Sequence, residues 1–321
     1  MTAEEKTFRQ YTQEQGKAYA ASRHGYPPQL FQTIIDHHTS TGGQLNTVVD
    51  VGCGTGEAIR GLAPHFTNAI GLDPSEGMLS VARSALGTSS TESGEPGIRF
   101  EFSTAEDLGA GQGGSPPVIA DGSVDLLSAA TAAHWFDMDR FWPRAARVLK
   151  PGGTVALWAR GRMFVYPHKT PNGAAIQAAV NDALDSEELQ PYKMAGNIVT
   201  RNLYVDLPLP WTLGAPVEEF EKESFFRKVW NENKGEGPES ESLVGGERTI
   251  TPEAFEAALG TASPVTRWRQ AHPDKAATEE DILRKMRKRI DSLLHEAGVK
   301  PGEERLVGGV PVVLLMIKKK T

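Results

Sequence analysis

A glycine-rich turn that follows a short apolar run constrains this sequence more than any other feature. Residues 48–58 read VVDVGCGTGEA, in which β-branched valines suit a buried strand and three glycines then alternate with other residues. Glycine accepts positive φ and has no Cβ atom, so the chain can turn sharply and a ligand can approach the main chain. The stretch therefore predicts a strand, a ligand-binding turn at Gly52, Gly54 and Gly56, and a following helix.

Short apolar runs alternate with helical patterns through the first half of the chain. The strand-like runs occupy residues 46–52, 68–73, 98–103, 124–130 and 153–159. Such alternation is typical of a parallel sheet wrapped by helices, because each crossover between parallel strands needs about a dozen residues or more. We therefore predict a doubly wound α/β fold.

The sequence divides into four predicted regions. We expect N-terminal lid helices over residues 1–44 and a Rossmann-like cofactor-binding core over residues 45–160. Residues 161–305 should supply a mostly helical substrate cap and the remaining core elements. Residues 306–321 are predicted to end in a strand at the sheet edge, because Pro311 lies near its start and lysines end it.

Composition narrows the classes of function. The 321 residues carry a formal net charge of -7, so we expect no nucleic-acid partner. Cys53 is the single cysteine, which excludes an intramolecular disulfide and a cysteine-based zinc site and fits a reducing compartment. No stretch reaches the roughly 20 apolar residues that span a bilayer. We expect a cytoplasmic protein with no membrane partner, and the sequence indicates no oligomeric state.

The acidic residues near the glycine turn distinguish between candidate cofactors. The spacing of Gly52, Gly54 and Gly56 does not match the dinucleotide fingerprint G-x-G-x-x-G. A carboxylate at Asp50 would repel phosphates and favour a cation. S-adenosylmethionine carries an ammonium and a sulfonium group and no phosphate. Asp73, at the end of the next strand, is placed to accept hydrogen bonds from ribose hydroxyls, so S-adenosylmethionine is the predicted cofactor.

Four motifs, in this order, resemble those of class I S-adenosylmethionine-dependent methyltransferases. They read VVDVGCGTG, GLDPSEGMLSVAR, STAEDL and VLKPGGTVALW and are spread over roughly residues 45–160. The flanks YAASRHGYP and AHWFDMDRF resemble the fungal and bacterial small-molecule methyltransferases typified by trans-aconitate methyltransferase. The resemblance implies a seven-stranded methyltransferase sheet with a helical cap, and S-adenosylhomocysteine as the product of the cofactor.

The resemblance also implies roles for individual residues. Asp50, Gly52 and Gly54 would hold the methionine end of the cofactor, and Asp73 would hold the ribose. The further predicted cofactor-binding residues are Tyr19, Arg23, Gly56, Pro74, Met78, Ala105, Glu106, Ala129 and Ala130. Thr104 stands where many relatives have an aspartate for the adenine amino group, so Glu106 or the backbone would serve instead.

His134 is the predicted catalytic residue. It follows the fourth strand, where the acceptor should enter, and could take a proton from the acceptor or hydrogen-bond to it. The alternative is that His134 and Trp135 only pack the top of the sheet. Tyr19 and Arg23 lie four residues apart, so on a helix they would share a face directed at cofactor or substrate.

The predicted methyl acceptor is a small-molecule metabolite. Family likeness favours a carboxylate, which is ionised near neutral pH and needs no catalytic base. Arg23 with Arg160, Arg162 or Arg201 could bind such an acceptor bidentately. The predicted acceptor-binding residues are Arg23, His134, Trp135, Trp158 and Tyr192. Aromatic residues of the cap could instead surround a larger apolar metabolite.

Alternatives from other classes stay open at this point. The chain could methylate a nitrogen, sulfur or phenol acceptor of secondary metabolism. It could also use the methyltransferase fold and cofactor without methyl transfer, because fold does not fix function. A nicotinamide-dependent oxidoreductase is disfavoured by the glycine spacing and by Asp50. No metal site is predicted, because His37 and His38 have no third ligand nearby in the sequence.

Overall fold

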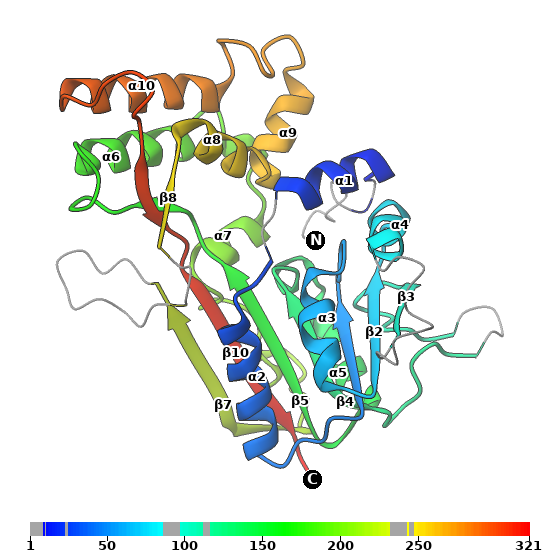
Figure 1. The fold of residues 1–321 in the computed structure, drawn as a ribbon. Coiled ribbons are helices and arrows are strands. Elements are labelled where there is room, and N and C mark those ends of the chain that lie inside the picture. Colours follow the sequence, from blue (N-terminus) through cyan, green and yellow to red (C-terminus); the bar gives the residue numbers. More distant parts are fainter. Residues whose placement is uncertain are drawn as a thin grey trace. The chain divides into compact units, whose positions relative to one another are not determined.

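The computed structural model divides the chain into two compact units (Figure 1). It describes residues 9, 11–22, 25–85, 97–111, 116–231, 243 and 247–321. The sheet unit comprises the described residues of Glu4–Ala159, Tyr204–Lys228 and Val313–Thr321. The second unit comprises those of Arg160–Leu203 and Val229–Val312. Each unit is assembled from segments far apart in the sequence.

A seven-stranded sheet, in the order β3-β2-β1-β4-β5-β10-β7, organises the sheet unit. Its strands are β1 (Thr47–Val51), β2 (Asn68–Asp73), β3 (Ile98–Phe102), β4 (Val124–Ala130), β5 (Leu149–Arg160), β7 (Phe220–Trp230) and β10 (Val312–Lys319). The first five are joined by parallel pairings, whereas β10 runs opposite to β5 (Figure 1). This mixed, open sheet confirms the predicted doubly wound Rossmann-like fold.

The chain order reverses at β1, which lies between β2 and β4. In open α/β sheets a ligand binds beyond the carboxyl ends of the strands at such a reversal, because the two following loops diverge there. The glycine turn follows β1 directly, and the AHWFD stretch follows β4. The topology therefore brings the two sequence stretches of greatest chemical interest to one edge of the sheet.

The helices of the sheet unit follow the strands in the expected alternation. They are α1 (Gln13–Ser22), α2 (Pro28–Ser40), α3 (Glu57–Leu62), α4 (Glu76–Ala85) and α5 (Met138–Val148). Helix α4 buries Met78, Leu79, Val81 and Ala82 on one side, as an amphipathic surface helix does. The two predicted N-terminal helices, α1 and α2, are both present.

The C-terminal strand corrects one prediction. The run expected as a single edge strand is split at Pro311 into β9 (Leu306–Gly309) and β10, and β10 lies between β5 and β7 inside the sheet. The seven residues from Val312 to Lys318 are buried, which is the pattern of a central strand. Its lysines do not mark an edge, because Lys319 Nζ donates to the carbonyl oxygens of Ala146 and Leu149 at 2.6 and 2.7 Å.

The second unit combines a small sheet with several helices. Strands β6 (Phe164–Val165), β9 and β8 (Glu247–Ile250) form an antiparallel sheet in that order. The helices are α6 (Gly173–Leu184), α7 (Ala195–Arg201), α8 (Pro252–Gly260), α9 (Ser263–Ala271) and α10 (Ile282–Glu296). They enclose a core that includes Phe255, Trp268 and Ile290. The expected cap thus contains a sheet as well as helices.

Within the described ranges, no helix is both long and apolar enough to cross a membrane.

Candidate active site

The turn after β1 has the backbone geometry that its sequence predicts. Gly52, Gly54 and Gly56 have φ values of 66°, 55° and 89°, a region that side chains with a Cβ atom rarely adopt. A Cβ atom at Gly52 would lie 2.7 Å from the Cβ of Ala132, so only glycine fits there. A Cβ at Gly54 would meet nothing within 4 Å among the described residues. The main chain at Gly54 therefore borders open space in which a ligand could lie.

Asp73 ties the turn after β1 to the turn after β2. Its Oδ2 accepts a hydrogen bond from the Gly54 amide and its Oδ1 accepts one from the Ser75 amide, both at 2.8 Å. Burial raises the pKa of Asp73 to about 6, although these two hydrogen bonds lower it. Each carboxylate oxygen can accept a further hydrogen bond. Asp73 is thus positioned as a preformed acceptor at the predicted ribose site.

Asp50 is a buried carboxylate with one unsatisfied oxygen. Its Oδ1 accepts a hydrogen bond from the Ser128 hydroxyl at 2.7 Å. Its Oδ2 is buried and has no hydrogen-bond partner among the described residues. Burial, with a smaller contribution from the nearby charges of Asp73 and Glu57, raises the pKa of Asp50 to about 7. An unpartnered buried carboxylate is costly, so the site fits a cationic group such as the ammonium of S-adenosylmethionine.

The residues expected at the adenine edge also form hydrogen bonds that stabilise the surrounding loops. Glu106 Oε1 accepts a hydrogen bond from the Asp137 amide at 3.0 Å, just before α5. Thr104 Oγ1 donates to Asp107 Oδ2 at 3.0 Å and accepts from the Asp107 amide at 3.1 Å, which fixes the turn after β3. Glu106 keeps a second carboxylate oxygen, so its predicted contact with adenine stays a prediction.

The remaining predicted cofactor residues of the sheet unit are mostly apolar and lie at strand ends or on α4. They are Pro74, Met78, Ala105, Ala129 and Ala130, of which Met78, Ala105 and Ala129 are buried. Tyr19 lies on α1, with its ring 6.3 Å from that of Tyr11. Arg23 lies outside the described residues, so the helix face shared with Tyr19 stays a prediction.

His134 is held by a residue that sequence reasoning missed. Its Nδ1 lies 3.0 Å from the hydroxyl oxygen of Tyr204, which belongs to the same unit and is 2% exposed. Burial raises the pKa of Tyr204 far above its ordinary value, so the phenol stays protonated. The Tyr204 hydroxyl and His134 Nδ1 therefore form a hydrogen bond whose direction depends on the tautomer of the imidazole.

A strained residue precedes His134. Thr131 has a φ of 53°, which is unusual for a β-branched side chain. Its amide donates to the Trp158 carbonyl at 2.7 Å and its hydroxyl lies 3.0 Å from that of Tyr26. Trp158 is fully buried, with its ring 5.6 Å from that of Tyr26. Its burial argues against the predicted direct contact of Trp158 with the acceptor and makes it a core residue below the loop.

Two other residues predicted to bind the methyl acceptor belong to different units. Trp135 is half-buried beside His134, with ring centroids 4.6 Å apart. Tyr192 belongs to the second unit, where its ring lies 5.9 Å from that of His272. The second unit also brings together Arg162 and Arg201, two of the arginines predicted to bind an anion.

The fold and the site define a Rossmann-like domain with a candidate cofactor cradle at the end of β1. Residues 49–157 match the family described as a methyltransferase domain. A probable S-adenosylmethionine-dependent methyltransferase of Saccharomyces cerevisiae is 34% identical over 140 residues, which cover 44% of this chain and 43% of that protein. A methyltransferase of Aspergillus aculeatus is 33% identical over 152 residues, 46% of this chain and 44% of that protein.

A solved structure from Anaeromyxobacter dehalogenans, described as a type II methyltransferase, shares the fold. It covers 92% of this chain and 97% of its own, with a TM-score of 0.58 and 23% identity. Residues 49–157 of the sheet unit therefore match a methyltransferase domain, and the chain shares the fold of a solved methyltransferase structure. The matches to the two sequence relatives span less than half of each relative's length. The family match, over residues 49–157, does not reach the second unit.

Proposed function

We propose that this chain transfers a methyl group from S-adenosylmethionine to a small-molecule metabolite. The observation that carries the proposal is the cradle at β1, within a matched methyltransferase domain. There the unpartnered oxygen of Asp50 and the open main chain at Gly54 fit a cationic ligand, and Asp73 offers acceptors to a ribose. A pyrophosphate at the glycine turn would instead meet the buried carboxylate of Asp50 and be repelled.

The residues of the chain have a modest task in this reaction. The bound cofactor supplies a methyl group activated by the sulfonium charge. The glycine turn and Asp73 orient the cofactor, and the loop from Thr131 to Phe136 forms the rim beyond β4 where an acceptor would approach. Alignment and exclusion of water account for most of the rate gain expected in such a transfer.

We propose a carboxylate as the acceptor, as in trans-aconitate-type enzymes. The support comes from the sequence likeness and from His134, to which we assign the neutral tautomer that accepts from Tyr204 at Nδ1 and offers Nε2–H as a donor. A donor suits an acceptor that is already ionised, because a carboxylate needs orientation and no base. Amine, phenol and thiol acceptors need a proton acceptor, which neutral His134 in this tautomer does not provide.

Product mass tests the proposal directly. The purified chain is incubated with S-adenosylmethionine and, in separate reactions, with di- and tricarboxylic acids, phenols, amines and thiols. We expect a methyl ester from at least one carboxylic acid, together with S-adenosylhomocysteine. Methylation of an amine, phenol or thiol alone would keep the cofactor assignment and overturn the acceptor class. Conversion of the cofactor without a methylated product would overturn methyl transfer.

A further inference from the structure

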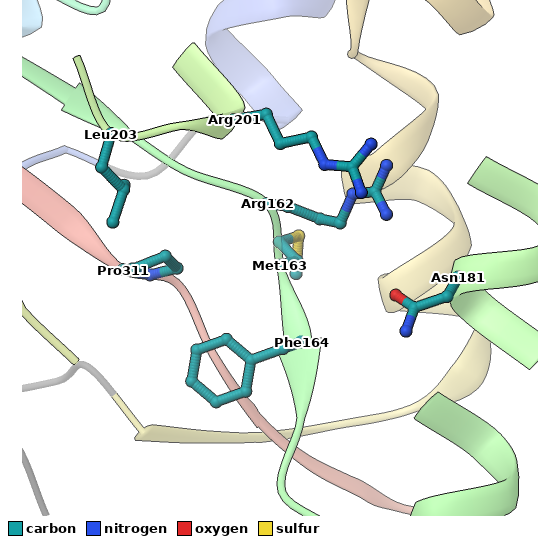
Figure 2. Close-up of a pocket in the computed structure, with 7 residues that line it drawn as sticks. All are labelled: Arg162, Met163, Phe164, Asn181, Arg201, Leu203 and Pro311. Atoms are coloured by element: carbon teal, nitrogen blue, oxygen red, sulfur yellow. The ribbon is translucent and has the colours of Figure 1, made fainter. Parts of the chain in front are cut away.

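A second pocket lies wholly within the second unit. It has a volume of about 280 Å³ and is lined by Arg162, Met163, Phe164, Asn181, Arg201, Leu203 and Pro311. Figure 2 shows the guanidinium groups of Arg162 and Arg201 close together on one side, with Met163, Phe164 and Pro311 below them. The pocket thus combines two cations with an apolar wall, and its volume is close to the lower end of the range for small-molecule sites.

One carboxylate is shared by three cations at this pocket. Asp185, directly after α6, accepts two hydrogen bonds from Arg162 at 2.7 and 2.8 Å and two from Arg201 at 2.9 and 3.3 Å. Lys193 Nζ donates to the same carboxylate at 3.0 Å. These neighbours hold the pKa of Asp185 far below its usual range. Because no other described acidic residue pairs with the three cations, two positive charges remain uncompensated.

Hydrogen-bond donors remain available at the pocket. Toward Asp185, Arg162 and Arg201 each use the two Nη atoms, which leaves the Nε–H and the second hydrogen on each Nη. Asn181 accepts a hydrogen bond from Gln177 through Oδ1, and its amide nitrogen donates to no described residue. An anion entering the pocket would therefore meet both surplus charge and unused donors.

A purely structural role for the cations does not account for this surplus. Helix α6 ends at Leu184, and the C-terminus of a helix carries roughly half a negative charge. Asp185 adds one negative charge, so about one and a half negative charges face three positive ones. The cations therefore exceed what Asp185 and the helix end require, and two of them, Arg162 and Arg201, line the pocket.

We propose that this pocket binds a small organic carboxylate. The ligand carboxylate would lie against Arg162 and Arg201, and its carbon skeleton would lie against Met163, Phe164 and Pro311. Guanidinium groups suit this ligand because their donors match a carboxylate bidentately. The inference goes beyond methyl transfer and does not depend on it, because every pocket residue belongs to the second unit.

Titration of the full chain with benzoate tests the proposal, with benzamide as a neutral ligand of the same shape. We expect calorimetry to show binding of benzoate and none of benzamide. Arg162→Gln and Arg201→Gln should each weaken benzoate binding at least about tenfold, because each removes charge-assisted hydrogen bonds. The matched control is Arg289→Gln on α10, which removes an equal charge from an exposed pair with Glu296 and should leave binding unchanged.

A second variant covers the case in which loss of an arginine disturbs folding. Asn181→Asp adds a negative charge at the pocket and leaves the three cations in place. We expect it to weaken benzoate binding while the melting temperature and the affinity for S-adenosylmethionine stay near those of the unmodified chain. Equal binding of benzoate and benzamide, an equal effect of Arg289→Gln, or unchanged binding in Asn181→Asp would each overturn the proposal.

Discussion

Some residues of the candidate site can be identified from a local sequence pattern. Others can be identified only from the fold, because they are distant in the sequence. The sequence indicates Asp50, Asp73 and the three glycines because each stands in a recognisable strand-and-turn motif. Tyr204 lies 70 residues from His134 in the chain and belongs to no motif, so no sequence signal could identify it. A partner at such separation is specified only by tertiary packing.

Asp73 offers the clearest test of cofactor binding at the residue scale. Replacing Asp73 by Ala removes the acceptor of the Gly54 and Ser75 amides and of the predicted ribose hydrogen bonds. We expect the affinity for S-adenosylmethionine to fall by roughly 1 to 3 kcal/mol. Calorimetric titration measures it, with Asp121→Ala as a control from an exposed ion-pair site in the same unit. Unchanged affinity in Asp73→Ala would exclude its predicted role.

Asp50 should make cofactor binding depend on pH. Its pKa in the fold is about 7, above the ordinary value near 3.9, so the folded chain binds this proton more tightly than the unfolded chain. The stability from that proton is complete below the ordinary value and is lost as the pH rises through about 7. A bound cation favours the ionised form, so we expect affinity for S-adenosylmethionine to increase between about pH 5 and pH 7.5.

The matched variant for this pH dependence is Asp50→Asn, which keeps the shape of the side chain and removes its titration. Its affinity for S-adenosylmethionine should vary much less over the same pH range. Asp73, with a pKa of about 6, leaves a smaller residual dependence. A profile as steep in Asp50→Asn as in the unmodified chain would show that the cation does not lie beside Asp50.

Tyr204 is a positioning residue for His134, and Tyr204→Phe separates positioning from packing. Nitrogen-15 spectra of the unmodified chain should show an unprotonated Nδ1 and a protonated Nε2 on His134. In Tyr204→Phe we expect a mixture of tautomers and a kcat about tenfold lower at unchanged cofactor affinity. Tyr166→Phe, in the second unit, is the control. A protonated Nδ1 in the unmodified chain would contradict the assignment.

At the scale of secondary-structure elements, the periodicity of apolar residues predicts the parallel strands well and the strands β7 and β10 poorly. Strands β2 and β4 begin and end as their apolar runs indicate. Strand β7 reads FEKESFFRKVW, and its many charged side chains suit its position at the edge of the sheet. Because these charges interrupt the apolar pattern, the sequence does not indicate a strand there. Strand β10 is apolar along its length, and the prediction of an edge was wrong because its terminal lysines bind backbone carbonyls instead of marking solvent.

The contact between α1 and α4 depends on a glycine, which makes a prediction at the element scale. A Cβ atom at Gly77 on α4 would collide with the carbonyl oxygen of Tyr11, just before α1. We expect Gly77→Ala to destabilise the fold by roughly 1 to 3 kcal/mol and to expose α1 to hydrogen exchange. Gly214→Ala is the control, since its Cβ would meet nothing within 4 Å. Equal stability of the two variants in urea would contradict this packing.

At the scale of the whole molecule, the sequence predicts the fold class but does not predict how the chain divides into two units. Ordered motifs predict a methyltransferase-type sheet, and the structure and the family match confirm it. The division into units is not readable from composition, because Tyr204–Lys228 and Val313–Thr321 return to the sheet unit after excursions into the second. Only strand pairing shows this return. The arginine pocket of the second unit likewise depends on residues joined by Asp185, which carries no sequence signature.

The central claim is that the cradle at β1 binds S-adenosylmethionine and no dinucleotide. Calorimetric titration of the purified chain with S-adenosylmethionine, S-adenosylhomocysteine and NADH, in parallel, tests it most directly. We expect saturable binding of the first two with one site per chain and no heat of binding from NADH, because Asp50 would repel a pyrophosphate. Binding of NADH without binding of the first two would contradict the account of the glycine turn and of every cofactor residue assigned to it.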